Sequence, residues 1–406
     1  MQRPAHRIVA TYRAAFGGLP RLTWLLCLAA FLNRCGAMVV PFLGLYAKER
    51  LGYSAAEAGD MLAIYGVGAV TGNWLGGWLT DRIGAVRIQV AALLASGIWM
   101  LGMSQGMQPG WLEAAIFMLA LFSEAFRPGS ITAVAASCPA DLRRKALSLN
   151  RLMLNLGWAF GPTIGGYLVT YNFDLMFYVD GGTCLLAAAF LAFGLGSFKA
   201  PPAPKVAGQR PARPWRDRHF VLLMVANLIT LIAFMQYFTT GSRIFEDDGY
   251  QRTSIGWFLA INPILIVMFE MVVVHALRHR AALPIVAIGA LVVGLGYLVL
   301  LAPLGAVGIV MAMAIMAGGE LLQMPLLSAY INDHAPAKAR GAYNGANGMV
   351  FSLAFIVAPA LGGRVYEHYG QDTLWIICGG LCAIATALFW WASRAAHSPT
   401  TSDASD

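Results

Sequence analysis

The sequence predicts an all-α integral membrane protein whose twelve transmembrane helices form two pseudo-symmetric six-helix bundles, with both termini in the cytoplasm. Of its 406 residues, 58% are hydrophobic and 12% are charged, whereas soluble domains carry about 25% charged residues. Apolar runs of about 20 residues, enough to cross a bilayer as a helix, recur from end to end. Continuous runs favour helices over the alternating strands of an outer-membrane barrel. The third observation is the uneven distribution of basic residues between these runs.

Charged, proline-rich and glycine-rich breaks divide the apolar runs into separate elements. The predicted spans are 22–47, 56–80, 86–106, 111–136, 145–170, 174–198, 218–243, 253–276, 282–301, 304–330, 342–366 and 371–393. They make an N-terminal bundle (22–198) and a C-terminal bundle (218–393), with cytoplasmic segments at 1–21, 199–217 and 394–406. Five prolines between positions 201 and 214 exclude a helix there, so we interpret 199–217 as an extended linker.

The basic residues orient the chain. With the N-terminus inside, 20 of the 28 Lys and Arg fall on the cytoplasmic side, five fall on the opposite side, and Arg34, Arg127 and Arg151 lie within spans. Because cytoplasmic loops carry an excess of Lys and Arg, both termini are predicted inside. A basic face that meets anionic lipid accounts for the net charge of +8. We therefore expect membrane lipids, not nucleic acid, as partners.

An internal repeat relates the two halves. Shifting the chain by 197 positions aligns Gly52 with Gly249, Gly59 with Gly256, Pro128 with Pro325, Pro162 with Pro359, Gly165 with Gly362 and Gly166 with Gly363. Chance identity between two glycine- and alanine-rich sequences is the alternative, and matched prolines in or beside helices disfavour it because such prolines are costly. Parallel six-helix repeats place a substrate site between the halves near the bilayer midplane.

Span 2 carries a glycine face and ends in a charged turn. Gly68, Gly72 and Gly76 recur every four residues, which leaves a bare face that a neighbouring backbone can approach. The turn that follows resembles the signature loop between helices 2 and 3 of the major facilitator superfamily, where acidic and basic residues latch the cytoplasmic ends of the two halves together. The resemblance implies this latch role for Gly77, Asp81, Arg82, Gly84 and Arg87. A charged stop-transfer loop would explain the charges but not the glycine spacing.

Span 5 contains Gly157, Gly161, Pro162, Gly165 and Gly166. This G-x-x-x-G-P-x-x-G-G core resembles the antiporter motif in helix 5 of the proton-coupled drug exporters of the same superfamily. Proline removes a backbone hydrogen bond and glycine permits close packing, so such a helix can bend against its partner. A glycine-rich packing helix without directional meaning is the alternative.

Ionisable residues inside spans are the candidate functional groups, because each costs about 2.5 to 3.5 kcal/mol at mid-membrane. Glu124 in span 4 and Glu320 in span 10 nearly coincide under the repeat, and each is followed by a proline, Pro128 or Pro325. We hypothesise that these two acids are the leading proton or cation sites.

Charge partners for these acids are also predicted. Arg127 lies one helical turn from Glu124 and can pair with it, and a static pair that only holds the fold is the alternative reading. Arg34 lies in span 1, and in the resembled family spans 1, 4, 7 and 10 line the central cavity. Two further acids, Glu270 in span 8 and Asp180 in span 6, are secondary candidates that could cap or pair at a helix end.

The predicted function is proton-coupled efflux of small amphipathic molecules or drugs by alternating access in the cell membrane, by a monomer similar to the drug:H+ antiporters of the superfamily. A proton-coupled importer of a metabolite or peptide is the alternative, and an integral-membrane lipid-handling protein is an alternative of another class. An adaptable apolar pocket could be formed by Trp158, Phe160, Met235, Tyr237, Phe238 and Met324, although lipid-facing or core packing would also explain most of them.

No enzymatic machinery is predicted. The sequence contains no G-x-x-x-x-G-K-[ST], H-E-x-x-H or G-x-S-x-G, so a gradient rather than ATP would drive transport. Its six cysteines fall in or beside spans and form no C-x-x-C, and we interpret them as packing residues. We expect no cofactor and no metal.

Overall fold

The computed structural model describes residues 16–36, 38–105, 111–139, 141–195, 213–277, 279–336 and 339–395. Over these ranges the chain is helical and contains no strand. Three predicted cytoplasmic segments fall mainly elsewhere: residues 1–15, 199–212 and 396–406 lie outside the described residues.

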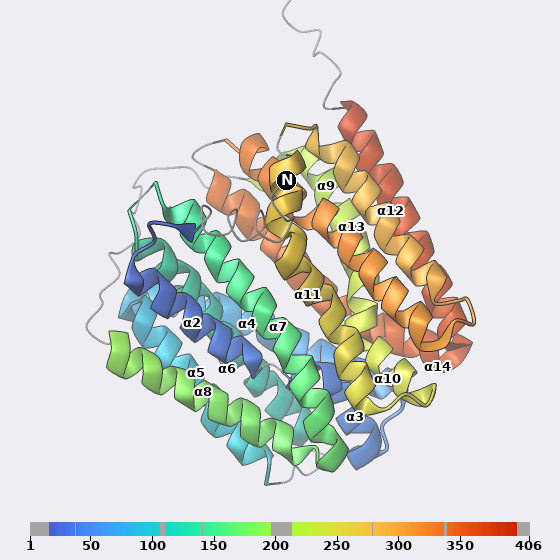
Figure 1. Cartoon of the computed structure of the whole chain (residues 1–406), viewed down its shortest axis with the longest axis horizontal. Helices are drawn as coiled ribbons and strands as arrows, with labels where there is room; N and C mark the ends of the chain where they lie inside the picture. Colours follow the sequence, from blue (N-terminus) through green and yellow to red (C-terminus); the bar gives the residue numbers. More distant parts are fainter. Residues whose placement is uncertain are drawn as a thin grey trace, which may run out of the picture.

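The helices form two groups that follow one another along the chain (Figure 1). The N-terminal group consists of α2 (Arg21–Cys35), α3 (Val39–Leu51), α4 (Ala55–Ile83), α5 (Ala85–Met103), α6 (Leu112–Ala136), α7 (Arg143–Tyr171) and α8 (Asp174–Leu195). The C-terminal group consists of η2 (Pro214–Arg216), α9 (Arg218–Thr239), α10 (Gly241–Asp247), α11 (Arg252–Leu277), α12 (Ala282–Val299), α13 (Gly305–His334) and α14 (Arg340–Ala395). The groups meet chiefly where α4 packs on α14 and α7 packs on α11.

Nine helical segments in the described part of the chain are long and apolar enough to cross a membrane. The longest, Ala342–Arg394, has 53 residues, more than twice the roughly 20 that a span needs, and its backbone breaks at Gly370, where φ is 80°. Both α4 and α7 have 29 residues, but they are less apolar and are not among the nine. The structure thus confirms an all-helical chain with several helices fit to cross a membrane, and the count of twelve stays a prediction.

Two predicted spans are not continuous helices. The first breaks between α2 and α3, and the seventh breaks between α9 and α10. At the first break, a Cβ on Gly36 would lie 2.6 Å from an Asp180 carboxylate oxygen, so only glycine lets α8 approach this closely. Discontinuous helices of this kind leave backbone groups that side chains must satisfy.

The glycine face of α4 packs inside the N-terminal group. A Cβ at Gly68, Gly72 or Gly76 would overlap a backbone carbonyl oxygen of α6, from Phe117, Leu121 and Ala125 respectively. The neighbouring backbone expected from the four-residue spacing is therefore α6, and the prediction of close helix packing is confirmed.

The contacts between the two groups repeat with the spacing found in the sequence. Glycine stands directly on a backbone carbonyl in four places: Gly59 on Pro359, Gly256 on Pro162, Gly363 on Ala55 and Gly166 on Arg252. The first two contacts are equivalent, since each residue of one lies 197 positions from its counterpart in the other, and the last two are equivalent in the same way. The α4–α14 and α7–α11 interfaces are thus equivalent, as expected for two halves related by a rotation.

Candidate functional site

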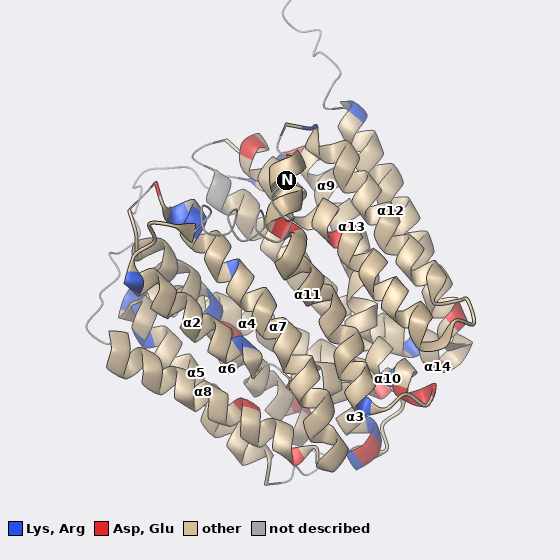
Figure 2. Cartoon of the chain, viewed as in Figure 1, with Lys and Arg blue, Asp and Glu red and all other residues tan. Residues whose placement is uncertain are grey.

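A cavity of about 500 Å³ lies between the two groups, within the range of small-molecule sites. Its polar lining from the N-terminal group comprises Asn33, Arg34, Asn73, Ser123, Glu124, Arg127, Arg151, Asn155 and Asp180. Its polar lining from the C-terminal group comprises Asn227, Asn262, Glu320, Ser328, Asn347 and Ser352. Figure 2 shows that charged residues otherwise gather towards the helix ends. Neither group forms the site alone.

Glu124 of α6 faces Arg34 of α2. Arg34 Nη1 and Glu124 Oε1 are 3.7 Å apart, and the two side chains are only 17% and 14% exposed. The Arg34 guanidinium also lies 5.2 Å from the ring centroid of Trp158 on α7, within cation–π range. A Cβ on Gly157 would come within 2.7 Å of Arg34 Cβ, so this motif glycine lets α7 approach α2 at the arginine.

Arg127 does not pair with Glu124. Within the described residues its guanidinium has no hydrogen bond or ion pair, although it lines the cavity and is exposed there. The close Glu124–Arg127 ion pair considered from the sequence is therefore not formed. Arg34 reaches Glu124 from the neighbouring helix, and Arg127 interacts with Glu124 only at longer range. Spacing along one helix indicates which side chains can meet, but not whether a side chain on another helix meets them first.

Glu320 of α13 lines the same cavity from the C-terminal group. Asn262 Nδ2 of α11 donates a hydrogen bond of 3.1 Å to Glu320 Oε2, and no Lys, Arg or His side chain in the described ranges forms an ion pair with it. The structure thus brings Arg34, Glu124, Arg127 and Glu320 to one cavity. Their roles in proton coupling stay predictions.

The secondary acids have different surroundings. Glu270 Oε1 of α11 lies 3.3 Å from Arg151 Nε of α7, so this pair joins the two groups. Asp180 is 2% exposed and accepts backbone hydrogen bonds from Met38 and Val39 at the start of α3. The first acid is a bridge between groups, and the second caps a helix at the break in the first span.

The antiporter-like segment of α7 contacts neighbouring helices on two of its sides. Gly161 and Pro162 are buried. A Cβ on Gly165 would come within 2.8 Å of Met38 Cβ, whereas Gly166 stands on Arg252 in α11. This segment therefore packs α7 against α3 and against the other group.

The latch-like residues lie at the turn from α4 to α5. Asp81, Arg82 and Arg87 are exposed, and the Arg82 guanidinium lies 3.8 Å from the ring centroid of Trp78. Gly84 adopts a φ of 98° that favours glycine, and a Cβ on Gly77 would lie 3.9 Å from Pro128 Cβ. Within the described ranges no ion pair joins these residues to the C-terminal group, so the latch stays a prediction.

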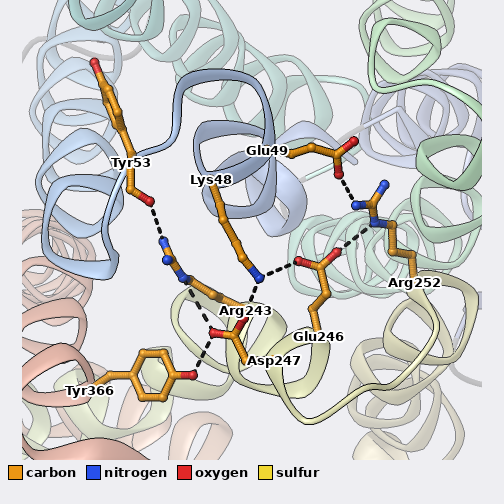
Figure 3. A network of polar contacts seen from close by, with 8 residues as sticks. All are labelled: Lys48, Glu49, Tyr53, Arg243, Glu246, Asp247, Arg252 and Tyr366. Atoms are coloured by element: carbon orange, nitrogen blue, oxygen red, sulfur yellow. Dashed lines mark hydrogen bonds and ion pairs between the residues drawn. The ribbon is translucent and has the colours of Figure 1, made fainter.

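A polar network at the opposite end of α4 was not predicted from the sequence. This network consists of Lys48, Glu49, Tyr53, Arg243, Glu246, Asp247, Arg252 and Tyr366 (Figure 3). It connects α3 and the α3–α4 turn of the N-terminal group with α10, α11 and α14 of the C-terminal group. From the sequence, its basic members Lys48, Arg243 and Arg252 are predicted only to be charges of the loops outside the cytoplasm.

Charge alternation holds this network together. Lys48 pairs with Glu246 at 3.3 Å and also with Asp247. Arg252 pairs with Glu246 at 2.8 Å and also with Glu49. Tyr366 adds a hydrogen bond of 2.7 Å to Asp247. One sequence signal could have revealed part of it: under the repeat Glu49 corresponds to Glu246, and both of these equivalent acids pair with Arg252.

The two helix groups contact each other differently at the two ends of the cavity. On the network side, the glycine-on-carbonyl contacts described above also bring the backbones of the two groups together. On the other side, the ion pair between Arg151 and Glu270 crosses between the groups. The network side is therefore the more firmly closed of the two.

The arrangement of the helices and the cavity defines the class of the protein. Membrane-length helices in two related groups that share a central cavity form the architecture of a secondary transporter. The chain belongs to the Major Facilitator Superfamily, whose sequence model matches residues 26–355 and 284–405. The resemblance stated from the sequence motifs is confirmed.

Relatives with assigned and unassigned functions cover nearly the whole chain. The Na(+), Li(+), K(+)/H(+) antiporter of Planococcus maritimus is 24% identical over 89% of this chain and 93% of its own. The multidrug resistance protein MdtH of Klebsiella pneumoniae is 21% identical over 87% of this chain and 89% of its own. The uncharacterized transporter YttB of Bacillus subtilis is 24% identical over 92% and 96%.

Solved transporter structures share the fold. A mutant of the peptide transporter POT in complex with sulfate superimposes with a TM-score of 0.79 at 18% identity, covering 94% of this chain and 96% of its own. A mutant of the nucleoside transporter NupG superimposes with a TM-score of 0.76 at 14% identity, covering 92% and 100%. At these identities the likeness concerns the fold alone.

Proposed function

We propose that this protein is a proton-coupled exporter of small amphipathic molecules that works by alternating access in the cell membrane. In this proposal the chain is a monomer of twelve spans, divided into bundles at 22–198 and 218–393, with both termini cytoplasmic. The observation that carries it is that one cavity joins Glu124 from one group and Glu320 from the other. The relative named as a multidrug resistance protein supports the substrate class.

The two acids have different tasks in this proposal. Glu124 has an arginine partner at 3.7 Å, so releasing or neutralising it changes how α2 and α6 are held together. Glu320 is held by the neutral side chain of Asn262 and can exchange a proton without breaking an ion pair. Proton transfer at Glu320, coupled to breaking the contacts between groups, would exchange the side from which the cavity is reached.

The energy available is sufficient for modest accumulation. One proton that moves down 100 mV yields about 2.3 kcal/mol. At about 1.4 kcal/mol per tenfold, this supports a substrate gradient of roughly 50-fold. Direct coupling to a single proton therefore requires no ATP-binding element.

Transport in proteoliposomes with an imposed pH gradient tests this proposal. We expect Glu320→Gln to abolish gradient-driven uptake of a fluorescent amphipathic dye, and Glu124→Gln to reduce it at least tenfold, while exchange without a gradient persists for Glu320→Gln. Glu113→Gln is the matched control, since Glu113 lies in the first turn of α6 and does not line the cavity. Full gradient-driven transport by both cavity variants would contradict the proton role.

Monovalent cation/proton antiport is a second candidate function, favoured by the relative with that name. It predicts that an outward Na+ or K+ gradient drives proton uptake into vesicles that contain the purified protein and no organic substrate. The same Glu320→Gln variant would stop this flux. Proton movement that occurs only with an organic substrate would instead favour export.

A further inference from the structure

The charges in the cavity are unevenly compensated. Two of its three arginines have acidic partners: Arg34 pairs with Glu124 at 3.7 Å, and Arg151 pairs with Glu270 at 3.3 Å. The third, Arg127, is exposed in the cavity without a hydrogen bond or ion pair to any described residue. Arg34 Nε, also in the cavity wall, is buried and has no acceptor among the described residues. This wall therefore offers guanidinium N–H donors that no described residue accepts from.

The apolar part of the cavity lies next to these donors. Trp158 of α7 contacts the Arg34 guanidinium and packs edge-to-face on Phe238 of α9, with ring centroids 4.7 Å apart. Met235, Tyr237 and Met324 continue this lining from the C-terminal group. Aromatic and methionine side chains provide an adaptable apolar surface. An oxyanion group at Arg127 would thus leave the rest of a small molecule against rings and thioethers.

We propose that the cavity takes amphipathic organic anions, whose carboxylate, sulfonate or phosphonate group binds Arg127 and whose apolar body packs against Trp158 and Phe238. A planar guanidinium binds such groups through two parallel hydrogen bonds. A cationic amphipath would be repelled by the Arg127 guanidinium, which forms no ion pair with a described residue. This inference rests on the proposed function in one respect: when Glu320 carries the proton, the C-terminal wall contributes no negative charge.

Binding measured without a gradient tests this inference separately from proton coupling. Three probes with the same ring system, 2-naphthoate, 2-naphthylmethanol and 2-naphthylmethylammonium, are titrated by calorimetry into the purified full-length protein in detergent at pH 7. We expect the parent to bind the anion at least tenfold more tightly than the alcohol, and the cation most weakly. Tighter binding of the cation, or no binding of the anion, would overturn the proposal.

Variants assign the preference to the arginine. Arg127→Gln should remove the advantage of the anion over the alcohol and leave alcohol affinity unchanged, and Arg127→Lys should restore only part, because lysine keeps the charge but not the forked geometry. Arg280→Gln, an exposed arginine outside the cavity, should behave as the parent. An Arg127→Gln protein that keeps the anion preference would refute the assignment. If that variant fails to fold, the anion preference of Arg127→Lys relative to that of the parent decides whether Arg127 binds the anion.

The two proposals fail in different ways. Loss of gradient-driven transport in Glu320→Gln with an intact anion preference supports both. An intact preference in a protein that shows no proton coupling leaves the binding inference standing and removes the coupling mechanism. Proton-coupled transport of a cation with no anion binding removes only this inference.

Discussion

At the residue scale, the structure shows how single polar side chains are satisfied at the ends of helices. Asp217 begins α9: its Oδ1 accepts a 3.0 Å hydrogen bond from the backbone N–H of Phe220. Its Oδ2 lies 2.7 Å from His334 Nε2 and accepts a 3.0 Å hydrogen bond from Tyr343. One carboxylate therefore ties the start of α9 to the end of α13 and the beginning of α14.

The pKa of Asp217 predicts the pH dependence of this junction. Burial raises the pKa, but the hydrogen bonds from Phe220, His334 and Tyr343 outweigh it, so the pKa lies below its ordinary 3.8. A lowered carboxyl pKa gives stability that is fully present above the ordinary value and is lost as the pH falls through the lower folded value.

Asn caps a helix as well as Asp does, so we expect Asp217→Asn to reduce stability by about 1 kcal/mol at pH 7 by weakening the hydrogen bonds of the carboxylate with His334 and Tyr343. The difference in melting temperature from the parent should shrink below about pH 4, as protonation weakens the parent too. Thermal unfolding followed by circular dichroism measures this, with the exposed Asp333→Asn as control. A difference that grows as the pH falls would show that Asp217 is not stabilising as an anion.

At the scale of elements, the glycines of α4 carry two kinds of contact. Gly68, Gly72 and Gly76 join α4 to α6 inside one group, whereas Gly59 joins α4 to α14 of the other. One helix thus holds its own group together and also forms part of the interface between groups. Small residues suit this position because helices in lipid associate through close packing rather than through the hydrophobic effect.

Gly→Ala substitutions at a crowded and at an open helical position distinguish the effect of packing from the effect of helix propensity. In a helix, Gly→Ala normally stabilises by about 1 kcal/mol. We expect this sign for Gly182→Ala in α8, where a Cβ would meet nothing within 4 Å. Gly72→Ala should instead destabilise by about 1–3 kcal/mol, because its Cβ would overlap the backbone of Leu121. Thermal unfolding of the two variants decides, and equal shifts would contradict the role of the α4–α6 contact.

At the scale of the whole molecule, the polar network holds one end of the cavity closed. Lys48 and Glu246, although 198 residues apart in the chain, lie in contact, and Arg252 connects acids of both groups. Each exposed ion pair contributes about 0.2–1 kcal/mol. Several together can set which side of an alternating-access transporter is closed, because about 1.4 kcal/mol changes a two-state population tenfold.

We expect Arg252→Gln to shift the population towards opening on the network side. The measurement is the labelling rate of a cysteine introduced at Ser352, which lines the cavity, by an impermeant maleimide added from that side. A several-fold increase over the parent background is expected. The exposed Arg216→Gln at the opposite end is the control. A labelling rate unchanged by Arg252→Gln would show that the ion pairs of Arg252 do not hold this end closed.

The sequence by itself determined the class of fold, the repeat and the acids that reach the cavity, because hydropathy, charge and glycine spacing act locally along a helix. Only the tertiary structure decided which charges pair. It placed Arg34 on Glu124 and joined Arg151 to Glu270, whereas Arg127 forms no ion pair within the described residues. Trp158 lines the cavity. Phe160, two residues further along α7, does not line it, and its side chain is 46% exposed. Such contacts depend on the rotation of each helix about its own axis and on which helices lie next to it. The periodicity within one segment specifies neither of these.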